Sequence, residues 1–142
     1  MKISTVKLTL VSLLLIIGIA SFFALKNHDY TATDILEDAN FNTEYPAVTV
    51  HQVDSNSKST FHEIKLTKKT QQELLEAFHS TTFEKASATS LTYDYRIEFM
   101  LAKGYVILLD TDNKKLTVSG TNEHYAITSD NAFLSILERE TK

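Results

Sequence analysis

Residues 91–110 read LTYDYRIEFMLAKGYVILLD, and their alternation of apolar and polar side chains predicts a pair of adjacent β-strands. From Leu91 to Leu101 every second residue is apolar, while the intervening positions hold Thr92, Asp94, Arg96, Glu98 and Met100. Such an alternation is typical of a strand that has one face in a core and the other face in water. The turn Ala-Lys-Gly at residues 102–104 then leads into a second strand, YVILLD.

One register between these two strands satisfies both their apolar and their charged side chains. A three-residue loop at residues 102–104 would place Phe99 opposite Ile107 on the apolar face. The same register places Arg96 opposite Asp110 on the other face. We therefore expect an ion pair at that position.

A meander is expected to continue beyond this pair of strands. The turn TDNK at residues 111–114 favours a third strand in which Lys115 lies opposite Asp110. A short fourth strand is expected at residues 124–128. Ser129 is a good N-cap for a last helix, whose apolar face carries Phe133, Ile136 and Leu137.

Two strands and a helix are expected before the meander. Residues 47–53 and 59–66 are strand-like and flank the turn-forming segment DSNSK, which predicts a β-hairpin. Residues 67–79, TKKTQQELLEAFH, are rich in helix formers and predict a helix whose apolar face holds Leu74, Leu75 and Phe78. Residues 80–90 are small and polar, and they read as a loop with room for a short edge strand.

These elements predict an α+β domain over residues 47–142, built on a mostly antiparallel sheet. The sheet would consist of the hairpin and a meander of three to four strands, with helices on one face. The preceding residues 26–46 are polar and acidic and are expected to form a tether. Within that segment, Thr31 followed by Asp34 predicts a capping box at the start of one short helix.

An apolar run at residues 8–25, LTLVSLLLIIGIASFFAL, predicts a transmembrane helix at the N-terminus. A helix of this length rises about 27 Å, which is close to the hydrocarbon thickness of a bilayer. The basic N-terminus, residues 1–7, holds two lysines, and a single lysine directly follows the run. This asymmetry favours a cytoplasmic N-terminus and a domain on the outside of the cell membrane.

A cleaved secretory signal is the alternative interpretation of the same run. Gly18 and Ala20 are the small residues that such a signal carries before its cleavage site, which would make Ser21 the new N-terminus and release the domain. The apolar run nevertheless continues to Leu25, as a retained anchor requires. We therefore expect a single-pass signal anchor.

Charge and composition exclude several classes of function. Two of the 14 basic residues lie in residues 1–25, where none of the 18 acidic residues lies, so the remainder has twelve basic and 18 acidic residues and a net charge of −6. Such a domain should repel nucleic acid. Cysteine is absent, which excludes disulfides, thiolate catalysis and thiolate zinc sites.

Metal and cofactor sites are weakly indicated. His51 and His62 would face each other across the hairpin if Asp54 paired with Ser59, and two imidazoles can hold a metal ion, but no third ligand is evident. The segment 110–114 begins like a calcium loop, yet it has a lysine where an oxygen ligand is needed. We expect a hairpin turn there, and neither a metal nor a cofactor.

No motif for catalysis is present, and the expected function is therefore a binding module. The solvent-exposed face of the first meander strand, which carries Thr92, Asp94, Arg96 and Glu98, is the expected partner-binding surface. The partner would be a protein or another component of the cell envelope. Two alternatives remain: an inhibitor or immunity protein directed against an extracellular enzyme, and a small hydrolase that uses carboxylates or the histidine pair. This layout, a short basic N-terminus followed by one membrane span and one small domain, is similar to that of many small exported proteins of Gram-positive bacteria.

Overall fold

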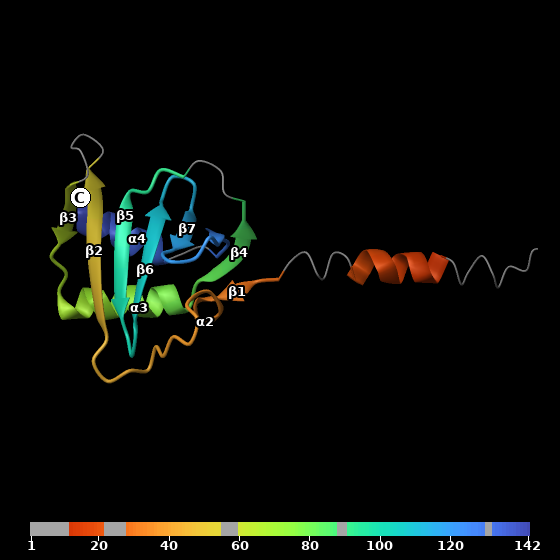
Figure 1. The fold of residues 1–142 in the computed structure, drawn as a ribbon, viewed down its shortest axis with the longest axis horizontal. Helices are drawn as coiled ribbons and strands as arrows, with labels where there is room; N and C mark the ends of the chain where they lie inside the picture. The colour runs from red at the N-terminus through yellow and green to blue at the C-terminus, as the bar shows by residue number, and fades with distance from the viewer. Residues whose placement is uncertain (1–11, 22–27, 55–59, 88–90, 130–131) are drawn as a thin grey trace, which may run out of the picture.

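The computed structural model describes residues 12–21, 28–54, 60–87, 91–129 and 132–142. From Tyr30 onward these residues form one antiparallel sheet of eight strands, with helices packed on one side of it (Figure 1). The order of strands across the sheet is β1-β4-β8-β7-β6-β5-β2-β3. The expected α+β class and antiparallel sheet are confirmed.

The strands follow one another along the chain with short helices between them. The strands are β1 (Tyr30–Thr31), β2 (Ala47–Asp54), β3 (Thr60–Ile64), β4 (Thr82–Ala86), β5 (Tyr95–Met100), β6 (Gly104–Asp110), β7 (Lys115–Val118) and β8 (His124–Ile127). The helices of the domain are α2 (Ala32–Ile35), α3 (Lys68–His79) and α4 (Ala132–Thr141). Residues 12–21 are also helical.

Four consecutive strands, β5 to β8, form the predicted meander. Asp110 lies opposite Lys115, as the TDNK turn predicts. The register between β5 and β6 differs from the prediction by two residues, because the loop closes at residues 101–103 and Met100 pairs with Gly104. A slip of two residues keeps every side chain on its face, so the predicted core face is correct although its pairs are not.

The predicted ion pair between Arg96 and Asp110 is wrong for the same reason. Arg96 lies opposite Leu108. The loop closes earlier because the Leu101 N–H donates to the Lys103 carbonyl at 2.9 Å. The Leu101 side chain is thereby tucked into the core, where it is only 9% exposed.

The sheet extends further than the sequence predicts, because two segments expected as tether and loop contribute strands. Residues 82–86, expected within a loop with room for an edge strand, form β4, which lies between β1 and β8. In the expected tether, residues 26–46, Tyr30 and Thr31 pair with β4. The core also takes in three residues that follow them: Ala32, Ile35 and Leu36. The domain therefore starts at Tyr30 rather than at residue 47.

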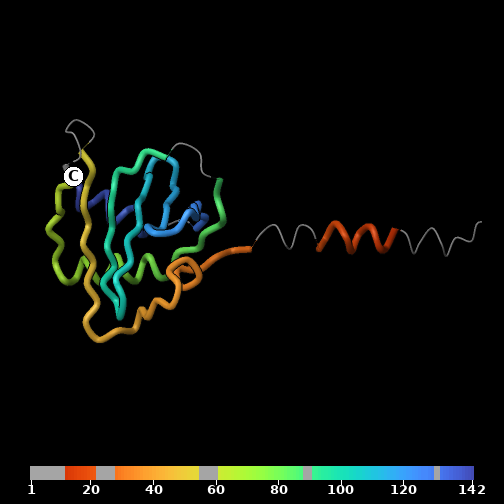
Figure 2. Tube along the Cα trace, in the orientation of Figure 1, coloured from red at the N-terminus to blue at the C-terminus, as the bar shows by residue number. Residues whose placement is uncertain are grey.

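The predicted capping box starts α2. The Thr31 N–H donates to the Asp34 carboxylate at 2.7 Å, which satisfies one of the free N–H groups at the helix start. This hydrogen bond lowers the pKa of Asp34. After α2 the chain runs along one end of the sheet to reach β2, which lies far from β1 in the strand order (Figure 2).

The centre of the core is Phe78 of α3. Its ring lies 4.6 Å from that of Phe99, 5.5 Å from that of Phe83 and 5.2 Å from that of Phe133. These contacts join α3 to two distant strands and to α4. The helix itself forms as predicted, and the Thr67 hydroxyl caps it by accepting from the Thr70 N–H at 3.1 Å.

Two further predictions concern the apolar run at residues 8–25 and the start of α4. The predicted helix at residues 8–25 lies partly outside the described residues, and no helix in the part of the chain that is described is long and apolar enough to span a membrane. The cap of α4 falls next to residues 130–131, which are outside the described residues. The Ser129 hydroxyl accepts from the Thr82 N–H at 3.2 Å.

The Phe78 cluster predicts a large effect of truncating Phe99. Phe99→Ala should lower the free energy of unfolding by about 3–5 kcal/mol, because it leaves a cavity beside the ring of Phe78 in the core. Thr92→Ala, on the exposed side of the loop before β5, should cost under about 0.5 kcal/mol. Urea denaturation of both variants measures the difference, and equal losses would show that the core face is misassigned.

Candidate functional site

The face of the sheet opposite the helices is the first candidate site. Figure 1 shows α3 and α4 on the same side of the sheet, and none of the helices in the described domain lies on the other side. The registers of neighbouring strands align one outward side chain from each of six strands in a row across this open face. We call this row the central row; it consists of Glu63, His51, Arg96, Leu108, Thr117 and His124.

Arg96 and Glu98 of β5 form an ion pair in the middle of the open face. Their side chains are 33% and 29% exposed, because neighbouring strands flank them. The flanking residues are partly apolar: Arg96 lies between His51 and Leu108, and Glu98 lies opposite Val106. A partly exposed pair of this kind adds little to stability. It does present charged donors and acceptors beside apolar surface.

Thr92 and Asp94, predicted to share this face, lie in the loop before β5 instead. The Asp94 carboxylate accepts from the N–H of Thr111 at 3.0 Å and also from its hydroxyl. The Thr92 N–H donates to the Asp110 carboxylate at 3.1 Å. These bonds fasten the loop to the turn after β6. Of the four predicted residues, Arg96 and Glu98 contact each other, whereas Thr92 and Asp94 contact the turn after β6.

The turn after β6 is organised around the Asp110 carboxylate. Asp110 is 2% exposed. It accepts from the Asn113 N–H at 2.9 Å and from the Asn113 amide at 2.8 Å. Burial raises the pKa of Asp110, but the hydrogen bonds from Asn113 and Thr92 outweigh it and hold the pKa below the ordinary value. The residue closes a hairpin turn, as predicted from the sequence.

The predicted histidine pair does not form. His51 lies opposite Glu63, and His62 lies opposite Gln52. The prediction paired Asp54 with Ser59, whereas Asp54 pairs with Thr60. A slip of one residue moves a side chain to the other face of the sheet, so the two imidazoles point in opposite directions. In the described part of the chain, no three His, Asp or Glu residues gather in a way that could hold a metal ion.

His51 has a polar atom that lacks a partner on the open face. Its Nδ1 is buried and has no hydrogen bond among the described residues. Its ring lies edge-on to Phe61 of β3, with the centroids 6.4 Å apart. Phe61 itself is 48% exposed. This corner of the open face therefore combines a buried nitrogen without a hydrogen bond, which costs desolvation energy, with exposed aromatic surface, which is unfavourable in water.

A hydrogen-bonded chain of three side chains lies on the other half of the open face. The Thr117 hydroxyl lies 2.8 Å from the Tyr93 hydroxyl and 2.6 Å from His124 Nδ1. A hydroxyl beside an imidazole is one requirement of nucleophilic catalysis. Thr117 is only 8% exposed, however, and Tyr93 covers it. These three hydrogen-bonded side chains fasten the loop before β5 to the sheet.

Tyr93 and Tyr95, which the alternation predicts on the same apolar face, lie on different faces of the sheet. Tyr95 is 7% exposed in the core, and its hydroxyl donates to the Thr141 hydroxyl of α4 at 3.1 Å. Tyr93 reaches the open face because β5 begins only at Tyr95. The alternation in the sequence therefore begins at Leu91, four residues before the strand that it predicts.

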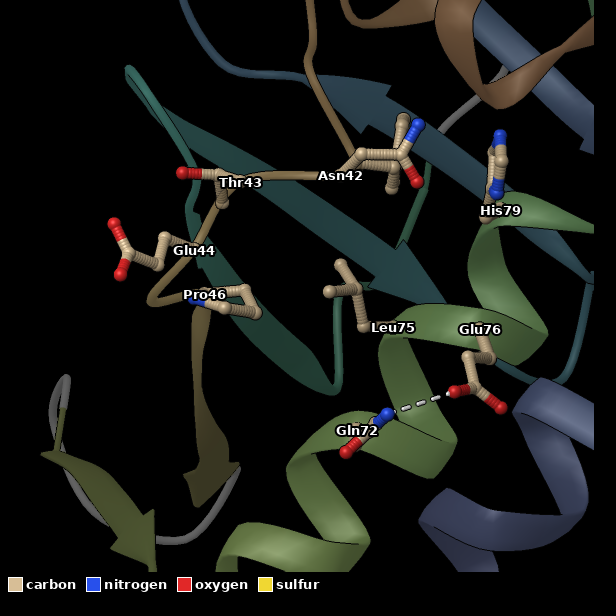
Figure 3. Close-up of a pocket in the computed structure, with 9 residues that line it drawn as sticks. Asn42, Thr43, Glu44, Pro46, Gln72, Leu75, Glu76 and His79 are labelled. Carbon is tan, nitrogen blue, oxygen red and sulfur yellow. Dashed lines mark hydrogen bonds between the residues drawn. The ribbon is translucent and has the colours of Figure 1, made fainter.

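A cleft between α3 and residues 41–48 is the second candidate site (Figure 3). It has a volume of about 380 Å³ and adjoins a second hollow of about 410 Å³. Leu75 points into the cleft from α3, and Pro46 lies on its other side (Figure 3). The residues shared by both hollows are Glu44, Pro46, Gln72 and Leu75.

Three of the polar side chains that line this cleft make contacts within the protein. The Gln72 amide donates to the Glu76 carboxylate at 3.0 Å. The His79 ring stacks on Phe41 with the centroids 4.4 Å apart. The cleft could not be found from sequence spacing, because residues 41–48 and α3 are brought together only in the folded domain.

Comparison with known proteins identifies no relative. No protein-family model matches the chain, and no curated protein or solved structure is significantly similar to it. The site is therefore interpreted from its own geometry.

The lowered pKa of Asp110 predicts a specific loss of stability in acid. A carboxylate whose pKa is lower in the folded state than in the unfolded chain stabilises the protein above the unfolded value, about 3.9, and this contribution is lost as the pH falls through the folded value. Wild-type unfolding free energy should therefore fall between about pH 5 and pH 2 more steeply than that of Asp110→Asn. Asp112→Asn, in the same turn, is the control and should keep the wild-type slope. Denaturation at a series of pH values checks this, and an unchanged slope in Asp110→Asn would contradict it.

Proposed function

We propose that the chain is a membrane-anchored binding module without catalytic activity, whose domain lies outside the cytoplasm. The domain binds a protein or another envelope component through the open face of its sheet. The observation that carries the proposal is the Arg96–Glu98 pair, which lies beside apolar side chains on a face without a covering helix in the described domain.

The composition of the open face supports a protein partner. Apolar side chains adjoin the ion pair, including Met100, which is 50% exposed, and Val106 and Leu108, which are partly exposed. Protein interfaces combine such apolar contacts with a few charged groups that fix orientation. Small-molecule sites are usually concave pockets, whereas this surface is an open sheet. A macromolecular partner therefore fits the surface better.

The N-terminal run supports attachment to a membrane. Residues 8–25 are uncharged, and within the described helix at residues 12–21 most of the large apolar side chains are more than half exposed. They include Leu13, Leu14, Leu15, Ile16 and Ile17. Exposed apolar surface of this extent is unfavourable in water and favourable in a bilayer. The lysines before the run favour an outward orientation of the domain.

The same surface would serve an inhibitor or immunity protein equally well. In that case the partner is an extracellular enzyme, and the open face blocks its active site. The two functions differ in the partner and not in the surface, so identification of the partner separates them.

Exchange of the two charges on β5 tests the proposed surface. The double variant Arg96→Glu with Glu98→Lys keeps the net charge and exchanges the positions of the positive and the negative side chain. The fold should therefore persist, while the charge pattern that a partner contacts is reversed. Capture of the partner from native membranes, measured by quantitative mass spectrometry, should fall at least about tenfold. The melting temperature of the variant checks that it is folded.

The matched control exchanges two charges on α3. Lys69→Glu with Glu76→Lys also keeps the net charge, and it alters the cleft that Glu76 lines. Capture should remain at the wild-type level. Loss of capture in this control, together with retention in the β5 variant, would transfer the binding function from the open face to the cleft.

Retention of the N-terminal run is tested by the mass of the mature protein. We expect the membrane fraction to contain the chain with residues 8–25 intact, because the apolar run continues beyond the small residues that precede Ser21. Intact-mass spectrometry of both cell fractions is the measurement. A mature N-terminus at Ser21 in the soluble fraction would show that the run is a cleaved signal.

A further inference from the structure

β3 is the edge strand on one side of the sheet, and the direction of its backbone groups follows from the hydrogen bonds of β2. The Val53 N–H donates to the Asp94 carbonyl at 2.8 Å, on the side of β5. Backbone groups of successive residues in a strand point to opposite sides, so Gln52 and Asp54 direct theirs toward β3. There they lie opposite His62 and Thr60.

Two residues of β3 consequently direct their N–H and C=O groups away from the sheet. They are Phe61 and Glu63, which alternate with the residues whose backbone groups face β2, Thr60 and His62. No strand among the described residues pairs with this side of β3. An unpaired strand edge is a template for a further strand, and proteins usually protect it with proline, lysine or a bulge, or by covering it.

The described residues of β3 carry one charged side chain, Glu63, and neither of the two residues most typical of protected edges. Their sequence is TFHEI, without proline or lysine, and Phe61 is 48% exposed. The opposite edge of the sheet differs, because its strand, β1, is only two residues long. An edge of five residues with an exposed aromatic ring is long enough to pair with a partner strand.

We propose that the partner supplies an extended segment that adds to the free edge of β3 as a ninth strand. This inference rests on the proposed function and specifies how the partner binds. The side chains of Phe61 and Glu63 lie on the open face, because Glu63 is opposite His51 in the central row. The added segment therefore continues the same surface that carries Arg96 and Glu98.

The side chains on the edge define the chemistry of the segment. An apolar residue fits beside the exposed ring of Phe61, and a basic residue fits beside the Glu63 carboxylate. Beyond the N-terminal run the chain has a net charge of −6, with twelve basic and 18 acidic residues, which also favours a basic partner. The partner segment is thus an extended chain in which apolar and basic side chains alternate on one face.

In two of its antiparallel registers, a second copy of this chain fits the edge less well. Antiparallel pairing centred on His62 would place Phe61 opposite Glu63 of the other copy, which leaves the carboxylate beside a phenyl ring. Pairing centred on Glu63 would place the two glutamates opposite each other, and like charges at that position are unfavourable. A basic segment from a different protein avoids both.

A synthetic peptide tests strand addition directly. The probe alternates threonine on one face with lysine and valine on the other, and the full-length protein is studied in detergent micelles. Binding is measured by fluorescence anisotropy, and protection of individual amides is measured by hydrogen exchange. We expect saturable binding and slower exchange at the amides of Phe61 and Glu63, whose N–H groups face the free edge. Binding without added protection at these two amides would overturn the proposal.

Two variants make the test specific. Phe61→Pro removes an outward N–H while His62 and Thr60 keep their bonds to β2, so affinity should fall at least about tenfold with the fold retained. Glu63→Lys should weaken binding of the lysine probe. It should restore affinity for a probe with glutamate in place of lysine. This charge rescue requires a folded protein, so it remains informative if Phe61→Pro is unstable. Equal affinity of both probes for Glu63→Lys would contradict the proposed pairing.

The remaining outcomes separate this inference from the proposed function. If native membranes yield a partner that wild type and Phe61→Pro capture equally, strand addition is wrong and the binding function stands. If the peptide binds the edge but no partner is captured from membranes, the proposed function fails. Sedimentation that shows a dimer abolished by Phe61→Pro would assign the edge to a second copy and overturn the proposal.

Discussion

The packing of Phe78 against both the sheet and α4 is the contact on which the architecture depends. Its ring lies within 4.6 to 5.5 Å of the rings of Phe99, Phe83 and Phe133, which come from two strands and a helix. Burial of these rings contributes a large part of the apolar stabilisation. It also holds α3 and α4 on one face of the sheet, and the free face is the consequence on which the functional proposal is built.

The faces of the sheet could be predicted from the sequence, whereas several registers could not. Alternation from Tyr95 to Met100 fixes which side chains enter the core, because the side-chain period of a strand is two. Registers depend on turn geometry, and here the loop before β6 closes one residue earlier than predicted, at residues 101–103, with Leu101 in the core. In the first hairpin a shift of one residue at Asp54 was enough to separate His51 from His62. Apolar patterns tolerate a slip of two residues but not of one.

The segments that the sequence misassigns are those with weak periodicity. Residues 30–36 are polar or acidic at several positions, yet Ala32 and Leu36 are fully buried, because β1 and α2 cover one end of the core. β4 contains a single fully buried side chain, Phe83, within small and polar neighbours. A strand with so few core residues is specified by its neighbours in the sheet and not by its own pattern.

The candidate site was predictable in part for the same reasons. Arg96 and Glu98 are on the predicted face because they belong to the regular part of β5. Thr92 and Asp94 are elsewhere, since the loop before β5 is fastened to the turn after β6 by side-chain hydrogen bonds that alternation does not indicate. The free edge at Phe61 depends on the order of strands across the whole sheet, which no local pattern contains.

Site-specific photo-crosslinking in native membranes tests most directly the claim that the open face binds a partner. A photoreactive amino acid in place of Met100, which is 50% exposed on that face, is compared with one in place of Gln72 in the cleft. If the open face binds the partner, position 100 gives one discrete crosslinked product and position 72 gives none. A product from position 72 alone would contradict it.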